Sequence, residues 1–418
     1  MIPSRPSRRA LRLLRSAWAS VAIVAVAWAS PASAADGYSI SNTITQQIVE
    51  HGVCRKVTNA LAAGKGLYVP TKYDTEWNNG AKAFLNNVIT GVSLAACLDA
   101  ASLRFKSASS TLLSRTFSAG NRQTWTWSGW VKRGSMGGAV YRALLSSGDG
   151  NNANGYFVLR YNPDDTIVAY STTDNVSTHL SCATTSVFRD VSAWHHVVLQ
   201  LNTTATSQAH RIKLFINGEP DPTFTCSTWP ALNSSHNINR AIVHGTGYFS
   251  FGANQFFDGY LADINFVDGQ ALTAAAFAEA DSDTDQWIPK AYGGTYGTNG
   301  HHLTFANPAS LGNDSSGGAK HWTATNFSTT AGTTYDPMGD YSSGSLGGNY
   351  PTWNPLDKAT TAPLSEGNLR ASGGALNVLW QAYATQSVPR AGKWYWEITM
   401  APTAGWNRHI KWLGLHAL

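Results

Sequence analysis

The chain has 418 residues, of which 43% are hydrophobic and 11% aromatic, so it can build two or three folded domains and is not a disordered chain. Charged residues make up only 13%, and the formal net charge is +5. Five arginines among the first fifteen residues account for that whole excess, so the remaining body is close to neutral. A neutral body excludes an electrostatic grip on nucleic-acid phosphates or acidic lipids.

The first 35 residues have the three parts of an export signal. A basic stretch ends at Arg15, an uncharged apolar run covers residues 16–30, and small residues follow at 31–35. This order predicts a secretory signal peptide cleaved after Ala34 or Ala35, and no membrane span after cleavage. The alternative, an uncleaved anchor, is disfavoured because fifteen apolar residues are short for a bilayer span.

A small α+β module is expected over residues 36–100. Short apolar runs at 53–57 and 67–70 predict strands, and the spacing of apolar residues from 76 to 89 predicts a helix. A module of this size rarely holds itself together without a crosslink. We therefore expect a disulfide to close it.

The four cysteines can pair in three ways, and an exported chain can oxidise them. Their proximity along the chain favours Cys54 with Cys97 and Cys182 with Cys226, one disulfide in each region. The sequence contains no C-x-x-C motif or Cys/His cluster that would predict zinc.

Residues 101–280 have the sequence pattern of an all-β domain. Strands are expected at 103–105, 124–131, 156–161, 166–170, 195–201 and 211–216. Clusters of glycine and asparagine separate these runs, and Asn217-Gly218 is a strong hairpin turn because both residues tolerate positive φ. The predicted fold class is an antiparallel β-sandwich, or jelly roll.

Four ordered motifs in this region resemble a known family. They are WTWSGWVK at 125–132, WHHVV at 194–198, LFING at 214–218, and FDGYLAD at 257–263 followed by a short tail to 277. Together they resemble laminin-G-like jelly rolls of the concanavalin A-like lectin and glucanase kind. The resemblance implies that the last strand returns to the sheet beside the first one.

Beyond residue 280 the chain resembles bacteriophage and prophage tail-associated proteins. The resemblance rests on WIPK at 287–290, YGTNG at 296–300, LGNDSSG at 311–317 and NPLD at 354–357. We interpret residues 281–390, rich in Gly, Ser, Thr and Asn, as an extended linker in which isolated short strands can occur. Residues 391–418 then resemble the start of a truncated SPRY-like domain, an incomplete second β-sandwich.

The sequence gives little support for catalysis. Laminarinases of the same fold carry two carboxylates on one face of a strand, but the pattern Glu-x-Asp-x-x-Glu is absent. The nearest pair, Asp258 and Asp263, has an odd spacing that places the two on opposite faces of a regular strand. We expect Asp258 to cap a turn and Asp263 to lie on the exposed face. No catalytic residue is predicted.

Two histidine pairs are interpreted as structural. Adjacent strand residues point to opposite faces, so His195 and His196 cannot chelate one ion together. The resemblance to the laminin-G-like family implies that this position packs beside a core tryptophan, here Trp194. His301 and His302 stand where the phage-like pattern carries aromatic residues, and they are expected to pack in the same way.

A binding site is expected on loops at the rim of the sandwich. Candidate ligand-binding residues are Asp149, Asn151, Asn152, Asn162, Trp229 and Tyr248, with Phe256 as a further aromatic side chain. Calcium is the one cofactor to consider, with oxygen ligands from Asp149, Asn151 and Asp165. The alternative is ordinary turn chemistry for the polar residues and core packing for the aromatic ones.

These features predict an exported, non-catalytic, lectin-like protein of prophage or tail-fibre ancestry that binds a glycan or cell-surface polysaccharide. The alternative is a structural or adhesive protein that binds another protein through the sandwich, and a glycoside hydrolase is less favoured. The signal peptide predicts a secreted, periplasmic or cell-surface location, whereas the phage resemblance favours a virion component. Tail-like relatives often form trimers, so an oligomer is compatible with this interpretation.

Overall fold

The computed structural model describes residues 101–136, 138–148, 150, 154–173, 177–249, 255–281, 285–330, 335–338, 351–359, 362–372 and 381–387. The predicted signal peptide, the 36–100 module with its Cys54–Cys97 disulfide, and the SPRY-like start at 391–418 lie outside the described residues and stay predictions. In the described part of the chain, no helix is long and apolar enough to cross a membrane.

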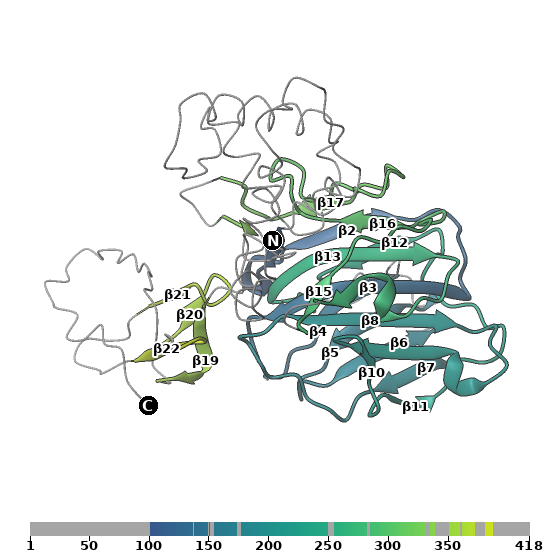
Figure 1. Ribbon diagram of the computed structural model, residues 1–418, viewed down its shortest axis with the longest axis horizontal. Coiled ribbons are helices and arrows are strands. Elements are labelled where there is room, and N and C mark those ends of the chain that lie inside the picture. The colour runs from purple at the N-terminus through teal and green to yellow at the C-terminus, as the bar shows by residue number, and fades with distance from the viewer. Residues whose placement is uncertain are drawn as a thin grey trace, which may run out of the picture.

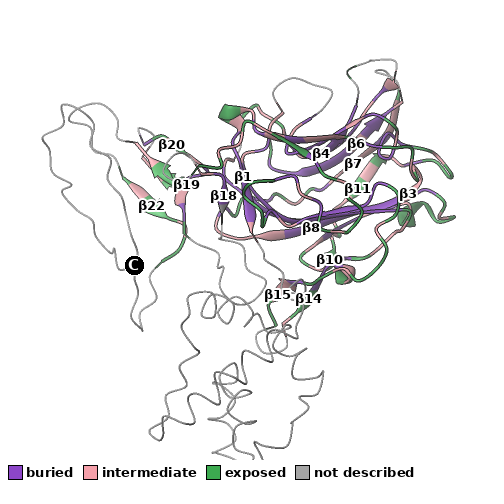
Figure 2. Ribbon diagram, turned by 90° about the horizontal axis from the view of Figure 1, so that it is seen from above, coloured by how far each residue is buried: buried purple, intermediate pink, exposed green. Residues whose placement is uncertain are grey.

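Within these ranges two antiparallel sheets pack face to face, which confirms the predicted β-sandwich (Figures 1 and 2). Sheet A has the order β10-β9-β8-β3-β13-β1-β18, with β16 also paired to β13. Its strands are β1 (Ser102–Phe105), β3 (Thr124–Arg133), β8 (His195–Asn202), β9 (Ile212–Ile216), β10 (Glu219–Pro220), β13 (Gly259–Asp268), β16 (His301–Leu303) and β18 (Pro337–Met338).

Sheet B has the order β11-β7-β6-β5-β4-β12-β2-β17. Its strands are β2 (Leu112–Thr116), β4 (Arg142–Ser147), β5 (Phe157–Tyr161), β6 (Ile167–Thr172), β7 (Thr178–Ala183), β11 (Thr225–Thr228), β12 (Val243–Thr246) and β17 (Thr323–Thr325). Short 3₁₀ turns lie at η4 (Ser107–Ser109), η6 (Gln208–His210) and η7 (Ala274–Ala276). Small two-stranded sheets pair β14 (Ala278–Ala280) with β15 (Trp287–Pro289), β19 (Trp353–Lys358) with β22 (Ala382–Ala384), and β20 (Leu364–Ser365) with β21 (Arg370–Ala371).

The strand order confirms two predictions. Strand β13 pairs with both β1 and β3, so the late strand returns beside the first one. The predicted hairpin joins β9 to β10, with Asn217 at φ 49° and Gly218 at φ 95°. Both values lie in the left-handed region that a tight hairpin turn requires.

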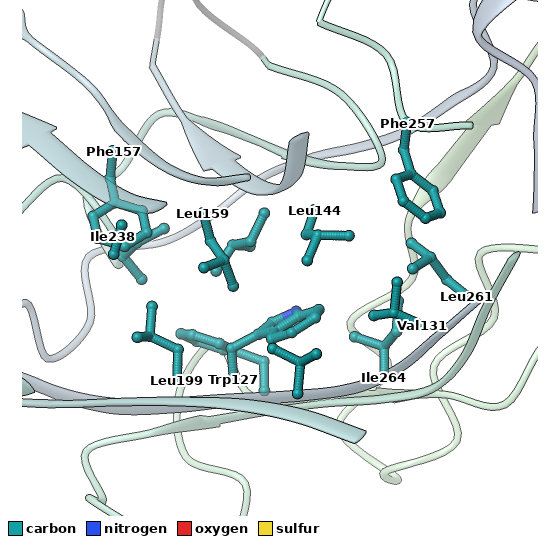
Figure 3. Close-up of a cluster of buried hydrophobic side chains, with 14 of the residues drawn as sticks. Trp127, Val131, Leu144, Phe157, Leu159, Leu199, Ile238, Phe257, Leu261 and Ile264 are labelled. Carbon is teal, nitrogen blue, oxygen red and sulfur yellow. The ribbon is translucent and has the colours of Figure 1, made fainter. Parts of the chain in front are cut away.

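The hydrophobic core lies between the sheets (Figure 3). Leu144, Phe157 and Leu159 of sheet B point toward sheet A and are fully buried. Facing them from sheet A is Trp127, also fully buried, among other apolar side chains of that sheet. On a regular strand such as β5, alternation of apolar residues therefore decides which side chains enter the core.

The disulfide predicted for the sandwich is confirmed. Cys182 on β7 and Cys226 on β11 are bonded and lie directly opposite each other in the strand register. The bond ties the edge strand β11 to sheet B.

The segment predicted to be an extended linker differs in the structure. Strand β16 pairs with β13 in sheet A, and β17 pairs with β2 in sheet B, so both sheets continue into residues 281–390. Strand β15 pairs with β14 on the outer side of sheet A (Figure 2). These strands of three residues carry too little local signal to be found in the sequence, because their stability comes from the sheets that they join.

Buried charges fix the later part of this segment on β1. Asp336 accepts ion pairs from Arg104 and Lys106, each at 3.0 Å, and its side chain is fully buried. Glu366 lies 3.3 Å from the Arg104 guanidinium. A linker without tertiary contacts would leave these two cations unpaired at the edge of the core.

The expected exposure of Asp263 is wrong. A β-bulge between Ala262 and Asn265 interrupts the register of β13 with β3, and Asp263 has a φ of 47°. Asp263 is only 7% exposed, and its Oδ1 lies 2.6 Å from Nε2 of His302. The bulge breaks the alternation on which the expectation rested.

Candidate functional site

The outer face of sheet B, which points away from the core, carries a group of polar and aromatic side chains. On β5, Phe157, Leu159 and Tyr161 face the core, so Val158 and Arg160 between them point outward. The register places Tyr170 of β6 beside Val158 on this outer face.

Aromatic rings follow one another across this face. Tyr156 meets Phe249 edge to face at 4.9 Å between ring centroids, and it lies 5.8 Å from Tyr170. Phe249 is buried on Ala143 and Val158, so it anchors the group, while Tyr156 and Tyr170 remain partly exposed. The result is a platform of two half-covered tyrosines above an apolar base.

The chain after β12 extends this platform. Tyr248 lies over Gly245 of β12, where an added Cβ would collide with the tyrosine ring. Ser146 donates a hydrogen bond to the Tyr248 carbonyl at 2.8 Å, and the rings of Tyr248 and Phe256 lie nearly parallel, 6.3 Å apart. Burial raises the pKa of Tyr248. The absence of a side chain at Gly245 is therefore what allows the Tyr248 ring to approach the sheet at this position.

Arg160 brings a positive charge to the same surface. Its guanidinium lies 3.9 Å from the centroid of the Tyr141 ring, and its Nη1 donates a hydrogen bond to Gln255 Oε1 at 3.0 Å. Burial lowers the pKa of Arg160, and the nearby tyrosines 141, 156 and 170 oppose that shift. We call this set the aromatic face: Tyr141, Tyr156, Arg160, Tyr170, Tyr248, Gln255 and Phe256.

Of the sequence-predicted binding residues that the structure describes, Tyr248 and Phe256 lie on the aromatic face. Trp229 is partly buried against the main core, at the far edge after β11. Asn162 lies in the turn between β5 and β6, where its amide nitrogen donates to Thr166 Oγ1. Asp149, Asn151 and Asn152 lie outside the described residues.

Asp165, the third calcium ligand predicted, already has protein partners. It has a φ of 70° in the β5–β6 turn and is 2% exposed. One carboxylate oxygen pairs with Arg133 at 2.9 Å and the other with Arg189 at 2.7 Å. Among the described residues no group of three or more His, Cys, Asp or Glu side chains could hold a metal ion. Calcium binding at Asp149 and Asn151 stays a prediction.

A buried Ser128–His196 pair on sheet A resembles a nucleophile and its base, but its hydrogen bonds assign it a structural role. Ser128 Oγ lies 2.8 Å from His196 Nε2, while the Trp287 indole donates to His196 Nδ1 at 3.0 Å. Because indole can only donate, Nδ1 must be the acceptor and Nε2 must carry the proton. Burial lowers the pKa of His196 to about 4, so the ring is neutral. His196 therefore donates to Ser128 and cannot take its proton.

The other paired histidines are also packed, as expected. His301 is buried, stacks on Phe266 at 5.5 Å and meets Trp322 edge to face at 5.0 Å. Burial lowers the pKa of His301 to about 4. His302 forms the pair with Asp263 described above. Both residues stabilise the sandwich.

Comparison with known proteins supports the fold. Residues 106–278 match the family model described as the concanavalin A-like lectin/glucanases superfamily. None of the curated proteins matches the sequence.

Several solved structures match part of this chain. A putative carbohydrate binding protein from Bacteroides ovatus is 12% identical, with 54% of this chain and 58% of that chain covered and a TM-score of 0.36. The heptameric SAP-like pentraxin from Limulus polyphemus is 13% identical (42% and 79% covered, TM-score 0.30). Domains LG4-5 of mouse laminin alpha1 are also 13% identical (41% and 44% covered, TM-score 0.29). At these identities and TM-scores the likenesses carry no information about a ligand.

Sequence reasoning missed Tyr156, Arg160 and Tyr170. The run FVLRY at 157–161 does contain the signal, because alternation around its apolar residues places Arg160 on the outer face. What alternation cannot show is that Tyr141, Tyr156 and Tyr170 surround that arginine, since they come from other strands and turns.

Proposed function

We propose that this protein is an exported, non-catalytic carbohydrate-binding protein of prophage ancestry and that the aromatic face of sheet B holds its glycan. The observation that carries the proposal is the platform of partly exposed Tyr156 and Tyr170, bordered by hydrogen-bonding groups. Tyrosine is suited to such a site because it offers an apolar ring and a polar hydroxyl at little cost in conformational entropy. The match of residues 106–278 to a lectin and glucanase superfamily supports the same interpretation.

In the proposed mechanism the glycan is bound and not altered. The rings of Tyr156 and Tyr170 would contact the apolar face of a sugar, while Arg160 and Gln255 would bind its oxygens. The aromatic face as defined contains no carboxylate, whereas glycoside hydrolysis ordinarily uses two. Export would also explain the Cys182–Cys226 disulfide, since such bonds persist in oxidising compartments.

The experiment is a glycan-array screen with the mature full chain, in the presence of Ca²⁺ and again with EDTA. We expect saturable binding that free sugar competes away. In Tyr156→Ala and Tyr170→Ala the glycan affinity should fall by about tenfold or more, as for other anchoring aromatic residues. Tyr383→Ala is the matched control, because Tyr383 is 38% exposed and lies on β22, outside both main sheets.

The outcomes separate the alternatives. If the folded chain binds no glycan, or if Tyr383→Ala weakens binding as much as Tyr170→Ala, the proposal is wrong. Turnover of a bound polysaccharide would indicate a glycoside hydrolase. If EDTA abolishes binding and the tyrosine variants bind as the wild type does, the binding site is the predicted calcium loop with Asp149 and Asn151 and not the aromatic face.

A further inference from the structure

Arg160 is partly buried and has no anionic partner among the described residues, whereas the two fully buried arginines each pair with an aspartate. Arg104 pairs with Asp336 at 3.0 Å, and Arg133 pairs with Asp165 at 2.9 Å. Within the described residues, Arg160 forms no ion pair, and its one hydrogen bond goes to the neutral amide of Gln255. Its Nε is buried and has no partner.

This arrangement is costly for the free protein. A guanidinium carries five N–H donors, and a buried donor without a partner, here Nε of Arg160, is destabilising. Tyr141 compensates only in part, since a ring face attracts a cation more weakly than a carboxylate does. A ligand that brings a negative charge would supply the missing partner.

The position of Arg160 also suits a ligand. The residue is partly exposed. It pairs with Val168, two positions along the strand from the Val158–Tyr170 pair, so both pairs lie on the same outer face. A sugar ring that stacks on Tyr170 or Tyr156 could thus place its own anionic group on Arg160. The planar fork of a guanidinium matches a carboxylate with two parallel hydrogen bonds.

We infer that the glycan recognised at the aromatic face is acidic and that Arg160 binds its carboxylate, an inference that rests on the proposed function. The ligand class is a polymer with carboxylated sugars, either uronic acids or sialic acids. A neutral glycan could stack on the same tyrosines but would leave the charge of Arg160 unpaired.

The test measures the affinity of the mature full chain for polygalacturonate and for the same polymer after reduction of its carboxyl groups, by titration calorimetry. Polysialic acid is the second acidic probe, which distinguishes the two sources of carboxylate, and dextran sulfate controls for charge without carboxylate. We expect at least one carboxylated polymer to bind about tenfold or more tighter than the reduced polymer, because two charge-assisted hydrogen bonds are lost on reduction.

Variants assign this preference to Arg160. Arg160→Gln should bind the acidic and the reduced polymers equally weakly, and Arg160→Lys should lose most of the preference although it keeps the charge. Arg370→Gln, an exposed arginine on β21, should behave as the wild type. Thermal unfolding of each variant shows that it is folded.

Failure of the inference differs from failure of the proposed function. Equal binding of reduced and acidic polymers by the wild type, or an acidic preference that survives Arg160→Gln, overturns the inference and leaves the glycan site in place. Tighter binding of dextran sulfate than of either carboxylated polymer also overturns it. Absence of binding to every polymer overturns both.

Discussion

The outer faces of the two sheets both carry aromatic and apolar side chains, but these side chains differ in how far they are buried. On sheet A, Val198, Phe215 and Val267 are buried under residues 272–281 and 285–296, which include Phe277 and Trp287. On sheet B, Tyr156 and Tyr170 rest on an apolar base and remain partly exposed. Among the described residues, the segment after β13 covers the outer face of sheet A, while the tyrosines of sheet B stay partly exposed.

The polar groups of the two faces also differ in their partners, although the Tyr170 hydroxyl on sheet B is paired with Thr178 Oγ1 at 2.8 Å. On sheet A, the Trp287 indole donates to His196, and the Tyr296 hydroxyl donates to Asn265 Oδ1 at 2.8 Å. On sheet B, the Arg160 guanidinium has only a neutral amide. Aromatic density alone therefore does not mark a binding face. What distinguishes sheet B is a cation at the surface, Arg160, whose Nε has no partner, because leaving a buried donor unpaired is unfavourable.

Removing the cover of sheet A should give the largest change in stability. Phe277 is fully buried against that face, so Phe277→Ala should lower the free energy of unfolding by about 3–5 kcal/mol. Tyr141→Ala on the aromatic face should lower it by only about 0.5 kcal/mol, since Tyr141 is 37% exposed. Urea unfolding of both variants measures the difference. Equal losses would mean that the aromatic face is part of the core and not a free surface.

The disulfide at the edge of sheet B should have an intermediate effect. It joins residues 44 positions apart, so replacing both cysteines in Cys182→Ala/Cys226→Ala should cost about 2–4 kcal/mol of stability. Thermal unfolding with and without reductant checks this, and the double variant should not respond to reductant. We expect glycan affinity at the aromatic face to survive in the folded double variant, because β11 lies two strands away from β6.

The smallest expected effect is a dependence of stability on pH. Burial lowers the pKa of His196 to about 4, below the ordinary value of about 6.5, so the unfolded state binds more protons between these values. Stability is therefore full above pH 6.5 and falls as the pH drops toward 4. His196→Gln should remove about 1 kcal/mol of the stability difference between pH 7 and pH 5.5. Denaturation series at the two pH values measure this difference in stability. His210→Gln, at an exposed histidine, is the control that should behave as the wild type.

The aromatic face should not share this dependence. Burial raises the pKa of Tyr156 and of Tyr248, so both stay neutral well above pH 7. Binding of a neutral sugar by the folded protein should thus be constant from pH 6.5 to pH 9, while a change within that range would place a titrating group in the site.

Local patterns in the sequence determined much of the sandwich. The apolar run at 156–161 was correctly predicted to be a strand, the Asn217-Gly218 pair specified its hairpin, and Cys182 was paired correctly with Cys226. These features depend on residues that are neighbours along the strand or turn, so their physical cause can be read in the sequence. The family motifs also gave the return of β13 to β1.

Only the tertiary structure decided which surfaces are covered and which polar groups are satisfied. Asp263 is buried because a bulge turns it toward His302, and β16 and β17 exist because the sheets offer them an edge. Arg160 is a candidate ligand group because no carboxylate of the described chain reaches it, a property of every surrounding strand at once. Side-chain alternation has a period of two residues, whereas the partners on an outer face also come from distant positions, as Gln255 lies 95 residues from Arg160 and Trp287 lies 91 from His196.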